Sequence, residues 1–345
     1  MTDAEDPDWY LDNVLIHASP GDYAARISVG PAALWQAWWR SQIPGATVLG
    51  ADRQGFVCTV AQATAAGFGR SEVRRARRRR ERSSPARSVL ASVCIDGADY
   101  ASERRRHALA ASGAALLHPG QTVSGRSAAI LHGLPTLAVP SVPEMTQSGA
   151  TLGRRAGAQV RGATISDLDR TDWFGAPVTT IPRTLVDLAR HSRRDALMAA
   201  DAALREAVTD RTAIEAALAS ATGWPGIKQA RAVLALANPL SESPLESITR
   251  LALHDDGFPP PQLQVEIVDP TRRSPWRVDL LWPDARLILE CDGQGKYTAA
   301  EARRERRREA RLRALGYRIE RLLWTEIVHS WPETSGRLRQ ALAAR

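Results

Sequence analysis

The chain has 345 residues, a formal net charge of +8 and 44% hydrophobic residues. Its length exceeds that of a typical single domain, so we expect two or three domains with sizeable cores. The basic excess favours polyanionic partners, nucleic acid above all, although a high-GC codon bias would also enrich arginine.

The cysteines and the chain termini narrow the class of protein further. Cys58, Cys94 and Cys291 form no C-x-x-C pair, so neither a disulfide framework nor a zinc knuckle is expected. The N-terminus is acidic and lacks an apolar signal core, and no apolar run approaches the roughly 18 residues of a membrane span. We therefore expect a cytoplasmic protein with no membrane partner.

Residues 51–134 are predicted to form a helix-turn-helix-like DNA-binding domain, following an uncertain N-terminal extension at residues 1–50. The segment 56–82 reads FVCTVAQATAAGFGRSEVRRARRRRER, in which a short helix, a turn at Gly67 and a very basic helix from Ser71 follow one another. The alternative is a solvated helix with a basic tail. The arginines expected to bind DNA phosphates here are Arg70, Arg74, Arg75, Arg77 and Arg78.

The segments that follow predict further elements. A winged form of the motif needs a hairpin, and one candidate strand runs from Val89 to Ile95. Residues 104–134 predict two helices. Residues 135–240 predict a small β-region, up to about residue 182, followed by a mostly helical middle region over 183–237.

Residues 241–345 predict an α/β domain. Ser243, Pro244 and Glu246 are typical of a helix start with a capping box. Strands are expected at 262–268, 276–282 and 286–291, joined by short turns as an antiparallel meander. A helix from Thr298 to Leu315 then leads to a fourth strand, which a right-handed crossover makes parallel to the third. The fold class is α/β locally and α+β overall.

Acidic residues stand at the ends of the two central strands of this domain. Asp279 lies within the second strand, Glu290 ends the third, and Asp292 and Lys296 follow. With Glu246 from the first helix, these carboxylates would repel one another unless a cation is shared, and Mg²⁺ or Mn²⁺ would suit them. Taken singly, Glu246 is explained as a cap, Asp279 by a pair with Arg277 or Arg286, and Asp292 by a turn.

The motifs SPLES, RVDLLWP, LILECDGQGKY and LRALGYRIERLLWTEI resemble the DUF559-type domains, which are similar to very-short-patch-repair endonucleases of the PD-(D/E)XK nuclease superfamily. The resemblance covers about residues 243–343 and implies a restriction-endonuclease-like mixed sheet flanked by helices. By the resemblance, Asp279 and Glu290 match the metal-binding acids and Glu246 the acid of the first helix. Asp292 and Lys296 complete the candidate catalytic residues, and Lys296 would neutralise the phosphate or orient the water. The usual E-x-K motif reads Glu290-Cys291-Asp292 here, so an acid stands at the lysine position.

Residues 56–134, with GAPVTTIPRTLVDLAR further on, resemble more loosely the AbiEi-type antitoxin domain, a winged helix. The two resemblances together imply a DNA-binding, Mg²⁺-dependent endodeoxyribonuclease, with a toxin or methyltransferase encoded nearby as a further partner. Arginines of the C-terminal helix would flank the cleavage site, namely Arg303, Arg307 and Arg311. The alternatives are a non-catalytic antitoxin-like regulator with a degenerate nuclease fold, and a module that binds or cleaves RNA.

Overall fold

The computed structural model describes residues 57–65, 71, 88–91, 95, 97–149, 152–155, 157–269, 275–292 and 299–344. Over these residues helices and three sheets form a mixed α/β protein, which confirms the predicted fold class. None of the helices in these ranges is long and apolar enough to cross a membrane. The extension at 1–50 and the basic helix expected after Ser71 lie outside the described residues.

A small two-stranded sheet begins the described chain. Strand β1 (Val57–Thr59) pairs antiparallel with β2 (Val89–Ala91), and helix α3 (Val60–Ala65) begins directly after β1. The first predicted helix of the helix-turn-helix is therefore present, and β2 lies within the strand expected from Val89 to Ile95. The pairing partner of β2 is a strand that precedes α3.

Two helices and a six-stranded mixed sheet follow. Helices α5 (Tyr100–Leu117) and α6 (Gly125–Leu131) confirm the two helices expected within 104–134. The sheet begins earlier than the predicted β-region, because its first strand precedes α6, and its order is β5-β6-β4-β3-β8-β7. Its strands are β3 (Thr122–Val123), β4 (Glu144–Gln147), β5 (Gly153–Arg155), β6 (Ala158–Gly162), β7 (Arg170–Trp173) and β8 (Ala176–Thr179).

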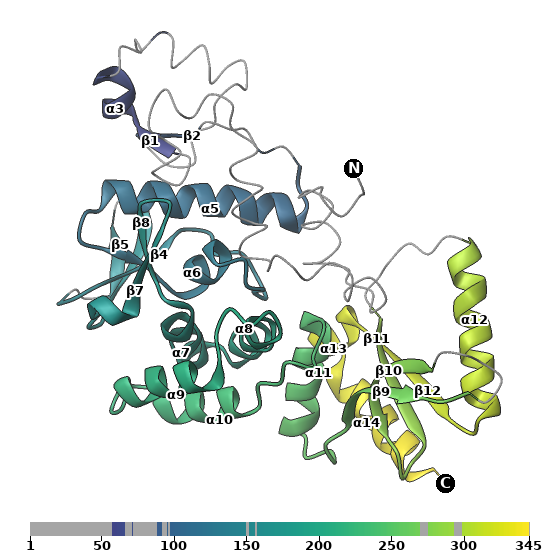
Figure 1. The fold of residues 1–345 in the computed structure, drawn as a ribbon. Helices are drawn as coiled ribbons and strands as arrows, with labels where there is room; N and C mark the ends of the chain where they lie inside the picture. Colours follow the sequence, from purple (N-terminus) through teal and green to yellow (C-terminus); the bar gives the residue numbers. More distant parts are fainter. Residues whose placement is uncertain are drawn as a thin grey trace.

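One continuous core serves both of these parts. Buried side chains from β1 and β2, from α5 and α6, and from the six-stranded sheet form a single cluster that extends from Val57 to Val178. In Figure 1, α5 runs along one side of this sheet, with the small β1–β2 sheet beyond it. Residues on both sides of the domain boundary expected at residue 134 thus contribute to the same hydrophobic core.

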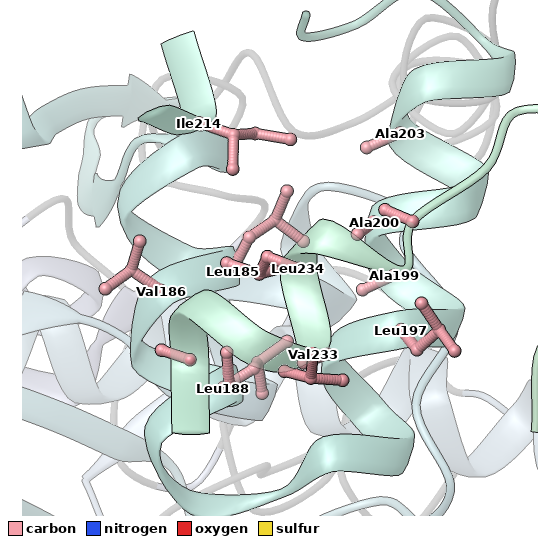
Figure 2. Close-up of a cluster of buried hydrophobic side chains, with 14 of the residues drawn as sticks. Leu185, Val186, Leu188, Leu197, Ala199, Ala200, Ala203, Ile214, Val233 and Leu234 are labelled. Atoms are coloured by element: carbon pink, nitrogen blue, oxygen red, sulfur yellow. The ribbon is translucent and has the colours of Figure 1, made fainter. Parts of the chain in front are cut away.

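The middle region is a bundle of four helices, which confirms the helical segment expected over 183–237. They are α7 (Ile181–His191), α8 (Arg193–Arg205), α9 (Arg211–Ser220) and α10 (Ile227–Ala235). Figure 2 shows how Leu185 and Leu188 of α7 meet Val233 and Leu234 of α10 in the centre of the bundle. Small alanines of α8 line the same core and permit close approach of the helices.

The C-terminal domain begins with α11 (Pro244–Asp255), which is tied to the middle bundle. Arg250 on α11 donates to the Asp201 carboxylate on α8 at 2.8 Å, and Arg193 forms a 2.6 Å ion pair with Asp255. Burial raises the pKa of Asp201 to about 6, against the opposing effect of the Arg250 charge. Leu251 also packs into the bundle core. Helix α11 is therefore held between the two regions.

The sheet of this domain has the predicted topology. Its strands are β9 (Gln262–Ile267), β10 (Trp276–Trp282), β11 (Leu287–Asp292) and β12 (Arg318–Leu323), in the order β12-β11-β10-β9. The pairs β9–β10 and β10–β11 are antiparallel, and β11–β12 is parallel across helix α12 (Ala299–Ala314). This confirms the meander and the crossover expected from the sequence.

The helices cover the two faces of this sheet unequally. Helices α11, α13 (Trp324–His329) and α14 (Trp331–Ala343) lie on one side, and α12 lies on the other (Figure 1). The first side has a large core around Leu280 and Leu289, whereas Leu312 is the fully buried residue that α12 adds to a smaller core. Contacts other than apolar packing must therefore help to hold α12.

Removing a central side chain of the middle bundle should destabilise the protein. Leu185 is fully buried, so Leu185→Ala should lower the free energy of unfolding by about 2–5 kcal/mol, through lost burial and a residual cavity. Leu168→Ala is the control, because Leu168 is 91% exposed and its removal should change stability by no more than about 0.5 kcal/mol. Urea unfolding followed by circular dichroism measures both, and equal effects would contradict the packing described.

Candidate functional site

Two of the acids singled out in the sequence lie on neighbouring strands. The last residue pair of β10 and β11 is Leu280 with Leu289, and Asp279 and Glu290 are the next residue along each strand. Burial raises the pKa of Asp279 well above its usual range, and the charges of Glu290 and then Glu246 raise it further. The pKa of Glu290 is also raised by burial, against the opposing effect of Arg308.

Each of these acids has one oxygen engaged by a strong donor. The backbone N–H of Cys291 donates to Asp279 Oδ2 at 2.8 Å, and Arg308 Nη2 donates to Glu290 Oε1 at 2.6 Å. No described residue donates to Asp279 Oδ1 or Glu290 Oε2. One oxygen of each carboxylate is thus available to a further partner.

The ordinary ion pairs considered for Asp279 are not formed. Arg277 instead forms a 2.6 Å ion pair with Glu242, and Arg286 Nη1 donates to the carbonyl oxygen of Leu315 at 3.3 Å. The expectation that Asp279 pairs with Arg277 or Arg286 is therefore wrong. Asp279 instead accepts a hydrogen bond from a backbone amide, and the charge of Arg308 opposes the rise in its pKa.

Glu246 is close enough to act on Asp279, but its own oxygens are in use. It is 4% exposed, its Oε1 accepts from Ser243 Oγ at 2.8 Å, and its Oε2 accepts from the Glu242 N–H at 2.9 Å. Ser243 in turn accepts from the Glu246 N–H, as expected of the predicted cap. Gln264 Nε2 also donates to Glu246 Oε2 at 2.9 Å.

Gln264 also belongs to this site, although no sequence pattern points to it. The pairs Val278 with Val265 and Leu280 with Leu263 bracket it, so that it lies opposite Asp279. Its φ of 51° is unusual for a residue other than glycine, and its Oε1 is buried without a hydrogen-bond partner. The edge strand is thus distorted next to the acid.

Asp292, the acid at the lysine position, is held by a different arginine. Arg321 on β12 forms a 2.7 Å ion pair with Asp292, and it also pairs with Glu305 at 2.7 Å and Glu309 at 2.9 Å on α12. The neighbouring Glu290 is held by Arg308. Hence the structure brings Asp279, Glu290 and Glu246 into electrostatic contact and gives Asp292 a separate cationic partner. Lys296 lies outside the described residues.

Helix α12 has two faces of different charge. Glu305 and Glu309 point toward the sheet, where they meet Arg308 and Arg321. The arginines on the outward side are exposed and form no ion pair with a described residue; they are Arg303, Arg304, Arg306 and Arg307. The exposed side of the helix is therefore strongly basic.

The predicted DNA-binding arginines fall into three groups. Arg303 and Arg307 lie on the exposed basic face of α12. Arg311 is bound to the buried Asp269 at 3.1 Å, so its guanidinium is already engaged by an acid. Five others are outside the described residues, namely Arg70, Arg74, Arg75, Arg77 and Arg78.

Arg308 is a site residue that the sequence reasoning missed. Within the run RRERRREAR one arginine cannot be told from another by composition. The apolar Leu312 was the available signal, because it is fully buried and marks the side of the helix that meets the sheet. Arg308 lies four residues earlier and therefore on the same face of the helix.

The donor set suits a hard divalent cation, with two carboxylates rather than three. Mg²⁺ usually binds one or two protein carboxylates and completes its shell with water and substrate phosphate. Asp279 and Glu290 each offer an oxygen, whereas both oxygens of Glu246 accept hydrogen bonds. Within the part of the chain that is described, no group of three or more His, Cys, Asp or Glu residues is arranged to hold a metal ion.

Comparison with known proteins finds relatives without an assigned activity. No family model matches the chain. It is 36% identical over 195 residues to "Uncharacterized protein Rv2248" of Mycobacterium tuberculosis (strain ATCC 25618 / H37Rv), which covers 56% of this chain and 70% of the relative. "Uncharacterized protein MT2308" of strain CDC 1551 / Oshkosh matches with the same identity and coverage.

Neutralising Asp279 should stabilise the protein in a pH-dependent way. The folded state holds the Asp279 proton more tightly than the unfolded chain does, so the stability from this group is present at low pH. It is lost as the pH rises through the raised pKa of the folded state. In Asp279→Asn the side chain at this position cannot ionise, so the variant does not lose this stability as the pH rises. The melting temperature of the variant in EDTA should thus exceed that of the wild type by little near about pH 4, and by more toward about pH 8.

The matched control for this measurement is Asp284→Asn, on the exposed turn between β10 and β11. It should leave the pH dependence of the melting temperature as in the wild type. A constant difference between Asp279→Asn and the wild type across this range would show that Asp279 titrates normally.

Proposed function

Since the chain belongs to the family of the Mycobacterium tuberculosis proteins Rv2248 and MT2308, whose names assign no activity, we propose its function from the site: a DNA-binding protein whose C-terminal domain is a metal-dependent endonuclease. The domain would hydrolyse DNA phosphodiester bonds with Mg²⁺ or Mn²⁺. Its resemblance to very-short-patch-repair endonucleases over residues 243–343 supports this proposal.

The observation that carries the proposal is the pair of buried carboxylates on neighbouring strands, each with one uncommitted oxygen. Asp279 and Glu290 lie on neighbouring strands, and the charge of Glu290 raises the pKa of Asp279. A fold that needed only stability would place an apolar pair at such a position, whereas a cation-binding site needs both acids.

The residues of the site would have distinct roles in binding the cation. Asp279 and Glu290 hold the cation through their uncommitted oxygens, and Glu246 fixes the start of α11 beside them. When bound, a divalent cation polarises a phosphate and activates water. Arg308 and the Cys291 N–H orient the two acids from the other side. This arrangement needs a phosphate group brought to the strand ends.

The exposed face of α12 would bring the nucleic acid there. Arg303 and Arg307, which belong to this face, are not neutralised by a described acid, and an exposed row of guanidinium groups binds a phosphate backbone without reading its sequence. Arg311 is not part of this surface, because it is held by Asp269. Contacts from the helix-turn-helix region would add to the affinity.

A non-catalytic regulator is the second candidate, and one observation favours it. Both acids of the Glu290-Cys291-Asp292 motif are ion-paired in this structure, Glu290 with Arg308 at 2.6 Å and Asp292 with Arg321 at 2.7 Å. A nuclease fold that had become a structural unit in an antitoxin-like repressor would gain from such pairing. The two candidates make opposite predictions about cleavage.

Incubation of the full-length protein with supercoiled plasmid and Mg²⁺ or Mn²⁺ tests the proposal. The wild type should convert the plasmid to nicked or linear DNA. Asp279→Asn and Glu290→Gln should each reduce the rate to about one hundredth or less, because each removes a carboxylate that the cation requires. Both variants should still bind labelled duplex DNA in EDTA, since neither residue lies on the basic face of α12.

Asp284→Asn is the matched control for these acids and should cleave at the wild-type rate. DNA binding without cleavage by the wild type, with either cation, would favour the regulator over the nuclease. Cleavage of a matched RNA in place of DNA would change the substrate class but keep the site. A magnesium-dependent rise in melting temperature that is absent in Asp279→Asn gives an independent readout of the cation site.

A further inference from the structure

Among the side chains of α12 that the structure describes, Arg308 is the one that contacts the acid pair, through Glu290. Its side chain is 15% exposed, and its Nη2 contacts both Glu290 Oε1 at 2.6 Å and the carbonyl oxygen of Arg277 at 2.8 Å. Its Nη1 donates to Glu305 Oε1 at 2.9 Å on the preceding turn of the same helix. The guanidinium is therefore fixed by three oxygens, and its plane is set by both the helix and strand β10.

Strand β11, on which the nuclease motif has a lysine, carries no basic side chain at that position. Position 292, where the nuclease motif has lysine, is an aspartate whose carboxylate is bound by Arg321. The charge of Arg308 acts on both acids of the site, because it opposes the rise in the pKa of Asp279 and of Glu290.

The contact between Arg308 and Glu290 leaves the second carboxylate oxygen of Glu290 uncommitted. Arg308 binds Oε1 of Glu290, and no described residue binds Oε2. An arginine that grips one carboxylate oxygen fixes the rotamer of the acid and aims the other oxygen, as donors behind metal-binding carboxylates do.

The rest of α12 holds Arg308 in place. Leu312, one turn later, is fully buried against the sheet. Glu305 and Glu309 pair with Arg321 on β12, so the helix is attached on the same side by a second arginine. Because these contacts fix the rotation of the helix about its axis, Arg308 points at the acids without a further conformational change.

We propose that Arg308 is the positioning residue of the cation site: it orients Glu290 from α12 and supplies the positive charge that the strand lacks. This inference rests on the proposed function. It names a residue outside the strand motif on which cation binding by Asp279 and Glu290 depends. A purely structural ion pair would leave cation affinity unchanged as long as the domain stays folded.

The test compares Arg308→Gln, Arg308→Lys and the wild type, as full-length proteins. The concentration of Mn²⁺ that gives half of the maximal rise in melting temperature should increase about 10–100-fold in Arg308→Gln, the range found when a group behind a metal ligand is removed. Arg308→Lys keeps the charge and should recover most of the affinity. The rate of plasmid cleavage at subsaturating Mn²⁺ should follow the same order.

Arg313→Gln is the matched control, because Arg313 pairs with Glu309 on the same helix at 3.2 Å and is 58% exposed. It should respond to Mn²⁺ as the wild type does. Melting in EDTA identifies any variant that does not fold. If Arg308→Gln is unfolded, the comparison of Arg308→Lys with the wild type decides, and a more than about 100-fold loss in Arg308→Lys would overturn the role given to the charge.

The outcomes separate this inference from the proposed function. If the wild type responds to Mn²⁺ and Arg308→Gln has the same half-saturating concentration, the positioning role is wrong and the cation site stands. Tighter binding in Arg308→Gln would mean that Arg308 competes with the cation, which also overturns it. A wild type that neither responds to Mn²⁺ nor cleaves DNA would overturn both proposals together.

Discussion

The repulsion between Asp279 and Glu290 is the constraint on which the C-terminal domain depends. Two acids on neighbouring antiparallel strands cannot both ionise cheaply away from water. Neighbouring donors stabilise the two carboxylates in part, because the Cys291 N–H binds one oxygen of Asp279 and Arg308 binds one oxygen of Glu290. A hydrogen bond to a charged group contributes about 1.5–3 kcal/mol, yet the pKa of Asp279 stays raised. These donors therefore satisfy the two acids only in part, and the cation of the proposed function would bind their remaining oxygens.

Much of the surrounding structure can be understood as support for that pair. The middle bundle holds α11 through the buried Asp201 and Arg250, and α11 in turn places Glu246 beside Asp279. On the opposite face, α12 is attached to the sheet by ion pairs around Arg308 and Arg321, with Leu312 as its fully buried anchor. The α11 side thus has a large apolar core in addition to its buried ion pair, whereas the α12 side depends mainly on ion pairs, so salt should affect the α12 side more.

The same division explains the two uses of arginine in α12. Arginines that meet Glu290 or Asp269 form ion pairs with them and hold the helix to the sheet. The outward ones, such as Arg303 and Arg307, keep their full charge because Glu305 and Glu309 are turned inward. A basic helix whose acids face the protein presents a surface of one sign, which is the kind that attracts a phosphate backbone.

The sequence by itself determined the secondary-structure elements of the C-terminal domain and the positions of its acidic residues along them. Apolar runs, the Ser243 cap and the turns predicted strands β9 to β12 and the crossover, because these depend on local periodicity and on short connections. The tertiary structure alone decided which charges meet. Arg308 and Arg311 are alike in sequence, yet the rotation of α12 on the sheet gives one to Glu290 and the other to Asp269. Likewise the parallel pairing of β11 with β12 brings Arg321 to Asp292, a contact 29 residues apart that no local pattern encodes.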